Sequence, residues 1–219
     1  TSSFWPLPGG YDHYLETLLN LLSRIAEEPT FEELVEWASK TLNAKSEWLK
    51  NSIRIIIIYS GLANLKGDKV YLTEKGSEFL KTRNPEIVLK AFLERIWGIR
   101  EIVLWLNQEG PLSIEQIFKK CLDFKVEWQH DYQVRYRLMW LQALGCIERR
   151  QDKYLLTSTG ERVAKEISSI GLLPEPYRER PTIITERVSE PAIVEPREEQ
   201  LSHSEMQNML VELGEFEGY

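Results

Sequence analysis

The chain contains one sequence pattern twice, and a single constant shift without gaps aligns the two copies. The first copy covers residues 53–62 and 70–76, and the second covers residues 137–146 and 154–160. In each copy a stretch ends at a glycine, a short segment with turn residues follows, and a Leu-Thr pair precedes a second glycine. The matched positions are Gly61 with Gly145, Leu72 with Leu156, Thr73 with Thr157, and Gly76 with Gly160. This order predicts, twice over, a helix stopped by glycine, a hairpin and a new helix.

Each copy also has a helix-start signal ahead of this pattern. Thr30 with Glu33 is a capping box, and Ser113 with Gln116 is a second one, displaced by one position from the shift of the repeat. In the first copy we expect helices near residues 14–27, 31–39, 45–60 and 74–81, with a hairpin over 62–73. In the second copy we expect helices near residues 84–97, 99–106, 114 onward, 130–144 and 158–170, with the tip of the hairpin at Arg149 to Lys153.

The fold class that follows is mainly α with small β-hairpins, in two tandem units. We expect an N-terminal arm, two units, a Pro/Glu-rich linker, and the start of a further C-terminal segment with a helix. Their residue ranges are 1–13, 14–82, 83–170, 171–200 and 201–219.

The charge of the chain is unevenly distributed. The formal net charge is −7, but residues 171–219 hold 11 of the 34 acidic residues and only 4 of the 27 basic ones. The chain up to Ile170 is therefore neutral overall. A neutral domain binds nucleic acid only if its Arg and Lys are gathered on one face.

The repeated order resembles the winged-helix family over residues 14–82 and 99–169. In that family the third helix usually lies in the major groove of DNA, and the hairpin, or wing, contacts the backbone or the minor groove. The resemblance implies that the main partner is double-stranded DNA. The third helix of the second copy then offers Gln129, Tyr132, Gln133, Arg135, Tyr136 and Arg137 on its outer face, and the wing offers Arg149, Arg150 and Lys153. Arg and Gln can read guanine and adenine edges.

The first copy offers fewer such residues. Its third helix supplies Lys45, Lys50, Asn51 and Arg54 before it becomes apolar at residues 55–58, and its wing supplies Lys66 and Lys69. An apolar helix of this kind also suits packing against a neighbouring unit or a protein partner. We therefore expect the second copy to be the main DNA-contacting unit.

The C-terminal segment resembles the opening helix of restriction-endonuclease-like nucleases. This resemblance covers residues 204–219, and Glu205 or Glu212 matches the early carboxylate of that fold. It implies that the chain is the recognition region of a restriction or defence nuclease, with Mg²⁺ needed only if a nuclease domain follows. The Asp and Glu-x-Lys that would bind the metal have no counterpart before residue 219.

The sequence predicts no catalytic or metal-binding residues within this chain and no cofactor. Its three histidines lie in different segments, and Cys121 and Cys146 have no partner at metal-ligand spacing. Two thiols without a CxxC motif indicate a reduced, cytoplasmic protein, and no apolar run is long enough for a membrane helix. Two alternatives stay open: a dimeric transcription regulator with a palindromic site, and a winged-helix module that binds protein.

Overall fold

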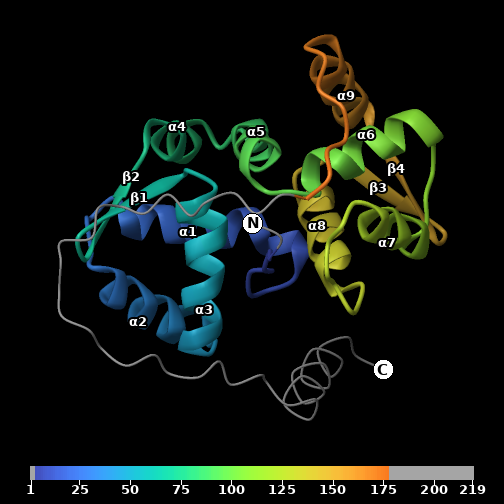
Figure 1. Ribbon diagram of the computed structural model, residues 1–219. Coiled ribbons are helices and arrows are strands. Elements are labelled where there is room, and N and C mark those ends of the chain that lie inside the picture. The colour runs from blue at the N-terminus through green and yellow to red at the C-terminus, as the bar shows by residue number, and fades with distance from the viewer. Residues whose placement is uncertain (1–2, 178–219) are drawn as a thin grey trace. The chain divides into compact units, whose positions relative to one another are not determined.

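In the computed structural model, which describes residues 3–177, helices and two small hairpins follow one another in the same order twice. Figure 1 shows the first copy in blue to teal and the second in green to orange. The first copy comprises α1 (Tyr14–Ile25), α2 (Phe31–Leu42), α3 (Ser46–Ile53), η2 (Arg54–Tyr59), β1 (Ala63–Lys66), β2 (Lys69–Leu72) and α4 (Glu74–Thr82). The second comprises α6 (Ile99–Glu109), α7 (Ile114–Asp123), α8 (Tyr132–Ala143), β3 (Ile147–Arg150), β4 (Lys153–Leu156) and α9 (Ser158–Ser169). A 3-10 turn, η1 (Tyr11–His13), precedes α1, and α5 (Pro85–Arg95) joins the two copies.

These elements confirm the predicted fold class, mainly helical with two antiparallel hairpins. The third helix of the first copy differs from its predicted form. It is α-helical only to Ile53 and continues as the π-helical η2, in which the amide of Ser60 donates to the carbonyl of Ile55 over 3.2 Å. Four consecutive isoleucines, each branched at Cβ, crowd the turn before them, and the wider π turn relieves this crowding.

Both predicted capping boxes are present at the starts of α2 and α7. The Thr30 hydroxyl accepts from the amide of Glu33 at 3.2 Å, and the Glu33 carboxylate accepts from the amide of Thr30 at 2.8 Å. Ser113 and Gln116 exchange the equivalent bonds at 3.3 and 2.8 Å. Each box satisfies two amides that a helix start would otherwise leave without a partner.

The two hairpins have the same register. Ala63 pairs with Leu72 in the first, and the equivalent residues of the repeat, Ile147 and Leu156, pair in the second. A short segment before the second helix of each copy extends the hairpin. In the first copy the amide of Val70 donates to the carbonyl of Pro29 at 2.9 Å, and the amide of Phe31 donates to that of Asp68 at 2.7 Å. In the second copy Leu112 and Tyr154 exchange two bonds, so each copy attaches this segment to its hairpin through two backbone hydrogen bonds.

The shared spacing of the Thr and Gly residues in the repeat has a structural cause. The Thr73 hydroxyl donates to the carbonyl of Gly61 at 2.7 Å and accepts from the amide of Gly76 at 3.1 Å. Thr157 makes the equivalent bonds to Gly145 and Gly160 at 2.6 and 3.2 Å. The Cα of the second glycine touches the backbone at the start of the hairpin so closely that a Cβ there would overlap a carbonyl oxygen.

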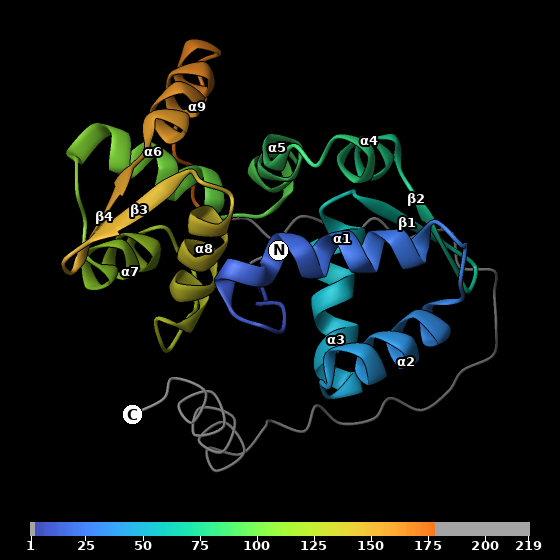
Figure 2. The same cartoon turned by 180° about the vertical axis from the view of Figure 1, so that it is seen from behind.

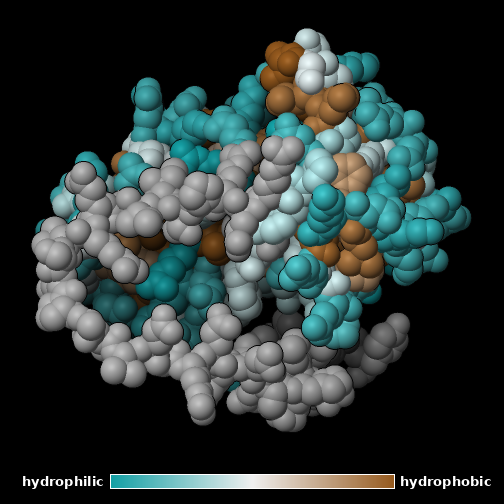
Figure 3. Space-filling model, in the orientation of Figure 1, coloured by the Kyte–Doolittle hydropathy of each residue, from teal (hydrophilic) through white to brown (hydrophobic). Residues whose placement is uncertain are grey.

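Buried side chains of both copies form one hydrophobic core. The N-terminal residues 4–8 lie between α3 and α8, as Figures 1 and 2 show from opposite sides. The face seen in Figure 3 is largely hydrophilic, with an apolar patch at the end of α9 where Ile170 and Leu173 are 69% and 66% exposed. Within residues 3–177, no helix has the length and apolar character needed to cross a bilayer.

Candidate nucleic-acid interface

Each hairpin ends in two cations that face each other across the strands. Lys66 pairs with Lys69 in the register of the first hairpin, and Arg150 pairs with Lys153 in that of the second. We call these two sets the tip pairs; they occupy matching positions of the repeat. Side chains directly opposite each other in an antiparallel pair lie on one face, where like charges are destabilising. Both copies therefore carry a repulsive arrangement that an anionic partner would stabilise.

The two tip pairs differ in their acidic neighbours. Arg150 lies 2.6 Å from the carboxylate of Glu148, and the preceding Arg149 lies 3.4 Å from that of Asp152. Within residues 3–177, Lys66 and Lys69 form no ion pair. The lysines of the first tip pair are therefore not held by a carboxylate, although the charge of Lys69 acts on Glu33, whereas both arginines of the second hairpin form ion pairs.

The cations of the second hairpin lie at its tip, as the sequence predicts. The turn itself consists of residues 151–152, so Arg149 and Arg150 lie at the end of β3 and Lys153 begins β4. All three side chains are exposed.

The third helix of the first copy exposes Asn51 and Arg54, and the exposed Lys45 immediately precedes its first turn. We call these three residues, together with Lys50, the α3 face. Lys50 is half-buried, with its amino group 3.3 Å from Glu47 and 3.4 Å from Glu32. Hydrogen bonds to Glu47 and then Glu32 raise the pKa of Lys50. Lys50 is therefore committed to neighbouring carboxylates, and the other three side chains are available.

The α3 face is linked to the first hairpin through one aromatic residue. The guanidinium of Arg54 lies 5.0 Å from the centre of the Phe31 ring, a cation–π arrangement. The amide of Phe31 donates to the carbonyl of Asp68 in the hairpin turn at 2.7 Å. The structure therefore connects Arg54 to the turn beside Lys69.

Arg137 does not lie on the outer face of its helix, contrary to the prediction. It is 0% exposed, and burial lowers the pKa of its guanidinium to about 10. Its Nε donates to the carbonyl of Trp97 at 2.8 Å and an Nη donates to the carbonyl of Gln133 at 2.7 Å. The guanidinium also lies 4.6 Å from the Trp128 ring centre. Arg137 supports the core and cannot reach a base edge.

The N-terminal segment covers the predicted reading face of α8. The amide of Phe4 donates to the side-chain oxygen of Gln133 at 2.8 Å, and the indole of Trp140 donates to the carbonyl of Trp5 at 3.1 Å. On the other side, the hydroxyl of Ser52 donates to the carbonyl of Pro6 at 3.2 Å. Gln133 is therefore occupied within the molecule.

The remaining predicted residues of α8 have mixed exposure. Gln129 and Arg135 are exposed, but Arg135 lies 2.7 Å from Asp131. Tyr132 and Tyr136 are half-buried, and burial raises the pKa of Tyr136. Gln129 lies before the first turn of α8 and not on the helix as predicted, and α8 itself offers little uncommitted polar surface.

Trp128, which precedes α8, belongs to an aromatic cluster. The Trp128 ring lies edge-on to Trp97, with centroids 5.6 Å apart, and Trp97 lies edge-on to Tyr177 at 5.7 Å. The indole of Trp97 also donates to the carbonyl of Glu175 at 2.9 Å. The described start of the linker, residues 171–177, is therefore attached to the second copy through these rings.

Other predictions concern metal, thiols and the C-terminal segment. Within residues 3–177, no three His, Cys, Asp or Glu side chains are placed to hold a metal ion. Cys121 and Cys146 are buried free thiols, and burial raises the pKa of each to about 12. Most of the linker, the C-terminal helix, Glu205 and Glu212 lie outside the described residues.

Comparisons with known proteins show a structural similarity at low sequence identity. No protein-family model matches the chain, and no curated protein matches it. A solved structure of the BpuJ1 endonuclease binding domain, in complex with pyrene- and phenanthrene-modified DNA, aligns with a TM-score of 0.46 at 11% identity. The alignment covers 77% of this chain and 84% of that one.

Proposed function

We propose that this chain is a module that binds double-stranded DNA through two tandem winged helices. The observation that carries the proposal is the tip pair, because two opposed cations recur at the same position of both hairpins. Such a pair lowers the stability of the hairpin by itself. Its recurrence is explained if each hairpin meets phosphate groups, which dominate the affinity of proteins for DNA.

The first copy is the better candidate for base contacts. Asn51 and Arg54 are exposed on the α3 face, and these residue types bond adenine and guanine edges in the major groove. Lys45, at the start of α3, and the tip pair of the first hairpin supply charges for the flanking phosphates. In this proposal the second copy contributes backbone contacts through Arg149, Arg150 and Lys153, and Gln129 and Arg135 supply further polar contacts.

The same proposal places the chain in a restriction or defence nuclease, as its recognition region. Support for this part comes from the sequence of residues 204–219, with Glu205 or Glu212 as the early carboxylate of a nuclease fold. The catalytic Mg²⁺ site would then belong to a domain beyond this sequence.

A titration of labelled duplex at several salt concentrations tests DNA binding. We expect log K to fall linearly with log salt, by about 0.9 for each phosphate neutralised. Lys66→Ala and Lys69→Ala should each reduce the size of that slope by about 1 and weaken the binding of all DNA sequences equally. Asn51→Ala should instead change which DNA sequence is preferred. Lys81→Ala, an exposed cation on α4, serves as the control with the same loss of charge.

The outcomes also separate the alternatives. A salt-independent signal, or no binding of duplex, would remove the DNA proposal and leave a protein-binding module. A dimer by light scattering, together with a palindromic preferred site, would instead favour a transcription regulator.

A further inference from the structure

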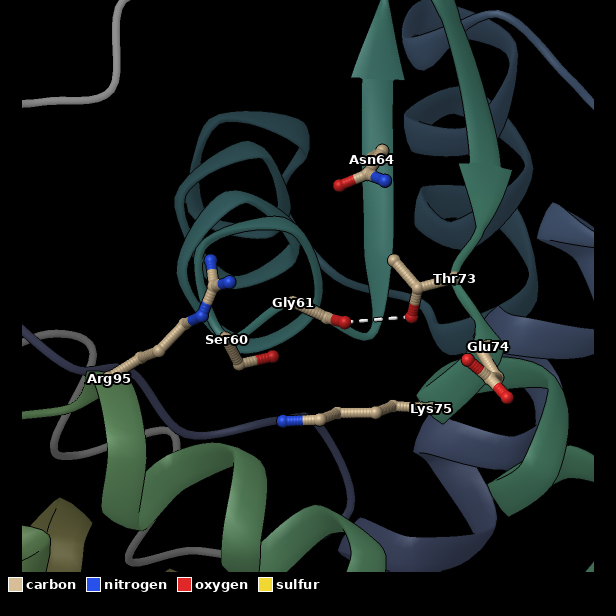
Figure 4. A pocket seen from close by; sticks show the side chains of 7 residues that line it. All are labelled: Ser60, Gly61, Asn64, Thr73, Glu74, Lys75 and Arg95. Atoms are coloured by element: carbon tan, nitrogen blue, oxygen red, sulfur yellow. Dashed lines mark hydrogen bonds between the residues drawn. The ribbon is translucent and has the colours of Figure 1, made fainter.

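A hollow of about 240 Å³ lies at the base of the first hairpin, away from the tip pair. It forms where η2 ends, α4 begins and α5 ends, and Figure 4 shows its lining side chains. The lining residues are Ser60, Gly61, Asn64, Thr73, Glu74, Lys75 and Arg95.

Arg95 supplies most of the hydrogen-bond donors of this hollow. Its guanidinium lies against Gly61, where a Cβ would come within 3.2 Å of Cζ. One Nη is 3.5 Å from the carbonyl of Tyr59, at the outer limit of a hydrogen bond. In the part of the chain that the structure describes, Arg95 forms no ion pair. A guanidinium has five N–H donors, so most of them remain available for a ligand.

Lys75 and Asn64 add donors from two other elements. The Lys75 amino group lies 2.5 Å from the carboxylate of Glu94. This hydrogen bond uses one of the three N–H donors of Lys75. In Figure 4 the Lys75 amino group extends toward Ser60 and the side where Arg95 lies, and the carboxylate of Glu74 points away from both cations. Asn64 is exposed on β1 at the rim.

The hydroxyl groups in the lining are already committed. The Ser60 hydroxyl donates to the carbonyl of Ile56 at 2.5 Å, and the Thr73 hydroxyl donates to that of Gly61 at 2.7 Å. The donors left for a ligand therefore belong to a guanidinium, an ammonium and an amide. This set suits an oxyanion, and a guanidinium matches the geometry of phosphate oxygens in particular.

The second copy serves as an internal comparison. At the positions that the repeat aligns with Ser60, Asn64 and Lys75, it has Leu144, Glu148 and Thr159. A carboxylate replaces the amide, and the cation is lost. The junction of third helix, hairpin and following helix is repeated, but α5, which carries Arg95, has no counterpart after α9 among the described residues, so the cationic lining is found in the first copy.

From this difference we infer that the hollow in the first copy binds a phosphate group. The group is either a backbone phosphodiester of the duplex or a free phosphate. If the group is a backbone phosphodiester, the inference rests on the proposed function. Duplex DNA would then bind at the first hairpin, which carries both the hollow and the Lys66–Lys69 tip pair. The chemistry of recognition is the same for both: bidentate contact from Arg95, with Lys75 and Asn64 closing around the remaining oxygens.

The test follows the side-chain NMR signals of Arg95 Nε–H and the Asn64 amide while inorganic phosphate or a duplex with unphosphorylated ends is added. We expect a saturable shift with at least one of the two probes. Replacing two lining residues by their second-copy counterparts, Asn64→Glu with Lys75→Thr, should weaken the binding at least tenfold. Arg95→Gln should do the same, and Arg83→Gln, an exposed cation outside the hollow, should leave it unchanged.

Each result has a separate meaning. A shift with duplex alone supports the site and identifies its ligand as a phosphodiester. A shift with phosphate when no duplex binds supports the site and removes the proposed function. If neither probe shifts Arg95, or if the double variant binds as tightly as the parent with an unchanged melting temperature, the inference is wrong.

Discussion

The two copies share their hydrogen-bonded framework and differ in the use of their third helix. In the first copy this helix ends in a π-helical turn and exposes Lys45, Asn51 and Arg54. In the second copy the corresponding helix, α8, is covered by residues 4–8, and its Arg137 is completely buried. A duplicated fold therefore keeps its caps and turns while the exposed surface of an equivalent helix changes. Function has to be assigned copy by copy, from side chains and not from the fold.

The largest expected effect tests whether Arg137 is a core residue. Arg137→Ala should lower the free energy of unfolding by about 4 kcal/mol, because it leaves a cavity and removes the donors to Trp97 and Gln133. Arg54→Ala, on the α3 face, should cost less than about 0.5 kcal/mol. Urea denaturation of both variants measures the difference. If Arg137→Ala is as stable as the parent, Arg137 lies on the exposed face of α8, as the sequence predicts.

The second prediction concerns what the copies have in common. Gly76→Ala and Gly160→Ala should each destabilise by about 3 kcal/mol, because the added Cβ overlaps the carbonyl oxygen of Leu62 or Cys146. Ser77→Ala and Glu161→Ala, the exposed neighbours, are the matched controls. Markedly unequal losses at the two glycines would show that the junctions are not equivalent.

A third prediction uses thiols that only the second copy has. Burial keeps Cys121 and Cys146 protonated up to a pKa of about 12, whereas the unfolded chain releases these protons near the ordinary value of 9.0. The folded state then binds more protons, so stability falls as pH rises from about 9 toward 12. The loss should be roughly 1.4 kcal/mol per thiol by pH 10.

Denaturation at pH 8 and pH 10 measures this loss in the parent and in Cys146→Ala. Cys146→Ala keeps one of the two thiols. Between pH 8 and pH 10, the part of its free energy of unfolding that is lost to thiol ionisation should therefore be about half of that in the parent. An identical pH dependence in parent and variant would mean that the Cys146 thiol does not contribute. The buried guanidinium of Arg137 opposes the trend, since its pKa is lowered to about 10.

The smallest effect separates the two tip pairs. Lys69→Thr should raise the free energy of unfolding by about 0.3 kcal/mol, because it removes the repulsion with Lys66, and should weaken binding of duplex. Lys153→Thr should raise the free energy of unfolding by a smaller amount, because the carboxylate of Glu148 already forms an ion pair with Arg150. Thermal denaturation and the salt titration are measured on the same samples. A variant that loses stability and keeps its DNA affinity would contradict the role of the tip pair.

The features that sequence predicted correctly are those set by neighbouring residues. A capping box acts within the first turn of a helix, and Thr73 acts between the end of one helix and the start of the next, so Thr30, Thr73 and both glycine stops were predictable. The π-helical turn at residues 54–59 was not predicted, because β-branched residues disfavour an α-helix without specifying which helical form replaces it.

The surroundings of Arg137 depend on a contact that is distant in sequence. Phe4 and Gln133 are separated by 129 positions, and no local pattern predicts that the N-terminal segment covers α8. One signal was available nonetheless. The shift that aligns Gly61 with Gly145 also aligns Ile53, a buried position of the first copy, with Arg137. An arginine at the interior position of a repeat indicates a buried cation that binds backbone carbonyls.

Because residues 4–8 lie between α3 and α8, the N-terminal segment ties the evolution of the two copies together. Phe4 precedes the first copy in the gene, yet its ring lies 5.3 Å from Phe92 and 6.1 Å from Trp140. A second copy transferred alone by recombination would lack this ring and expose Trp140 to water. We expect selection on the earliest codons to act through folding of the later copy, so that the two halves evolve as one heritable unit.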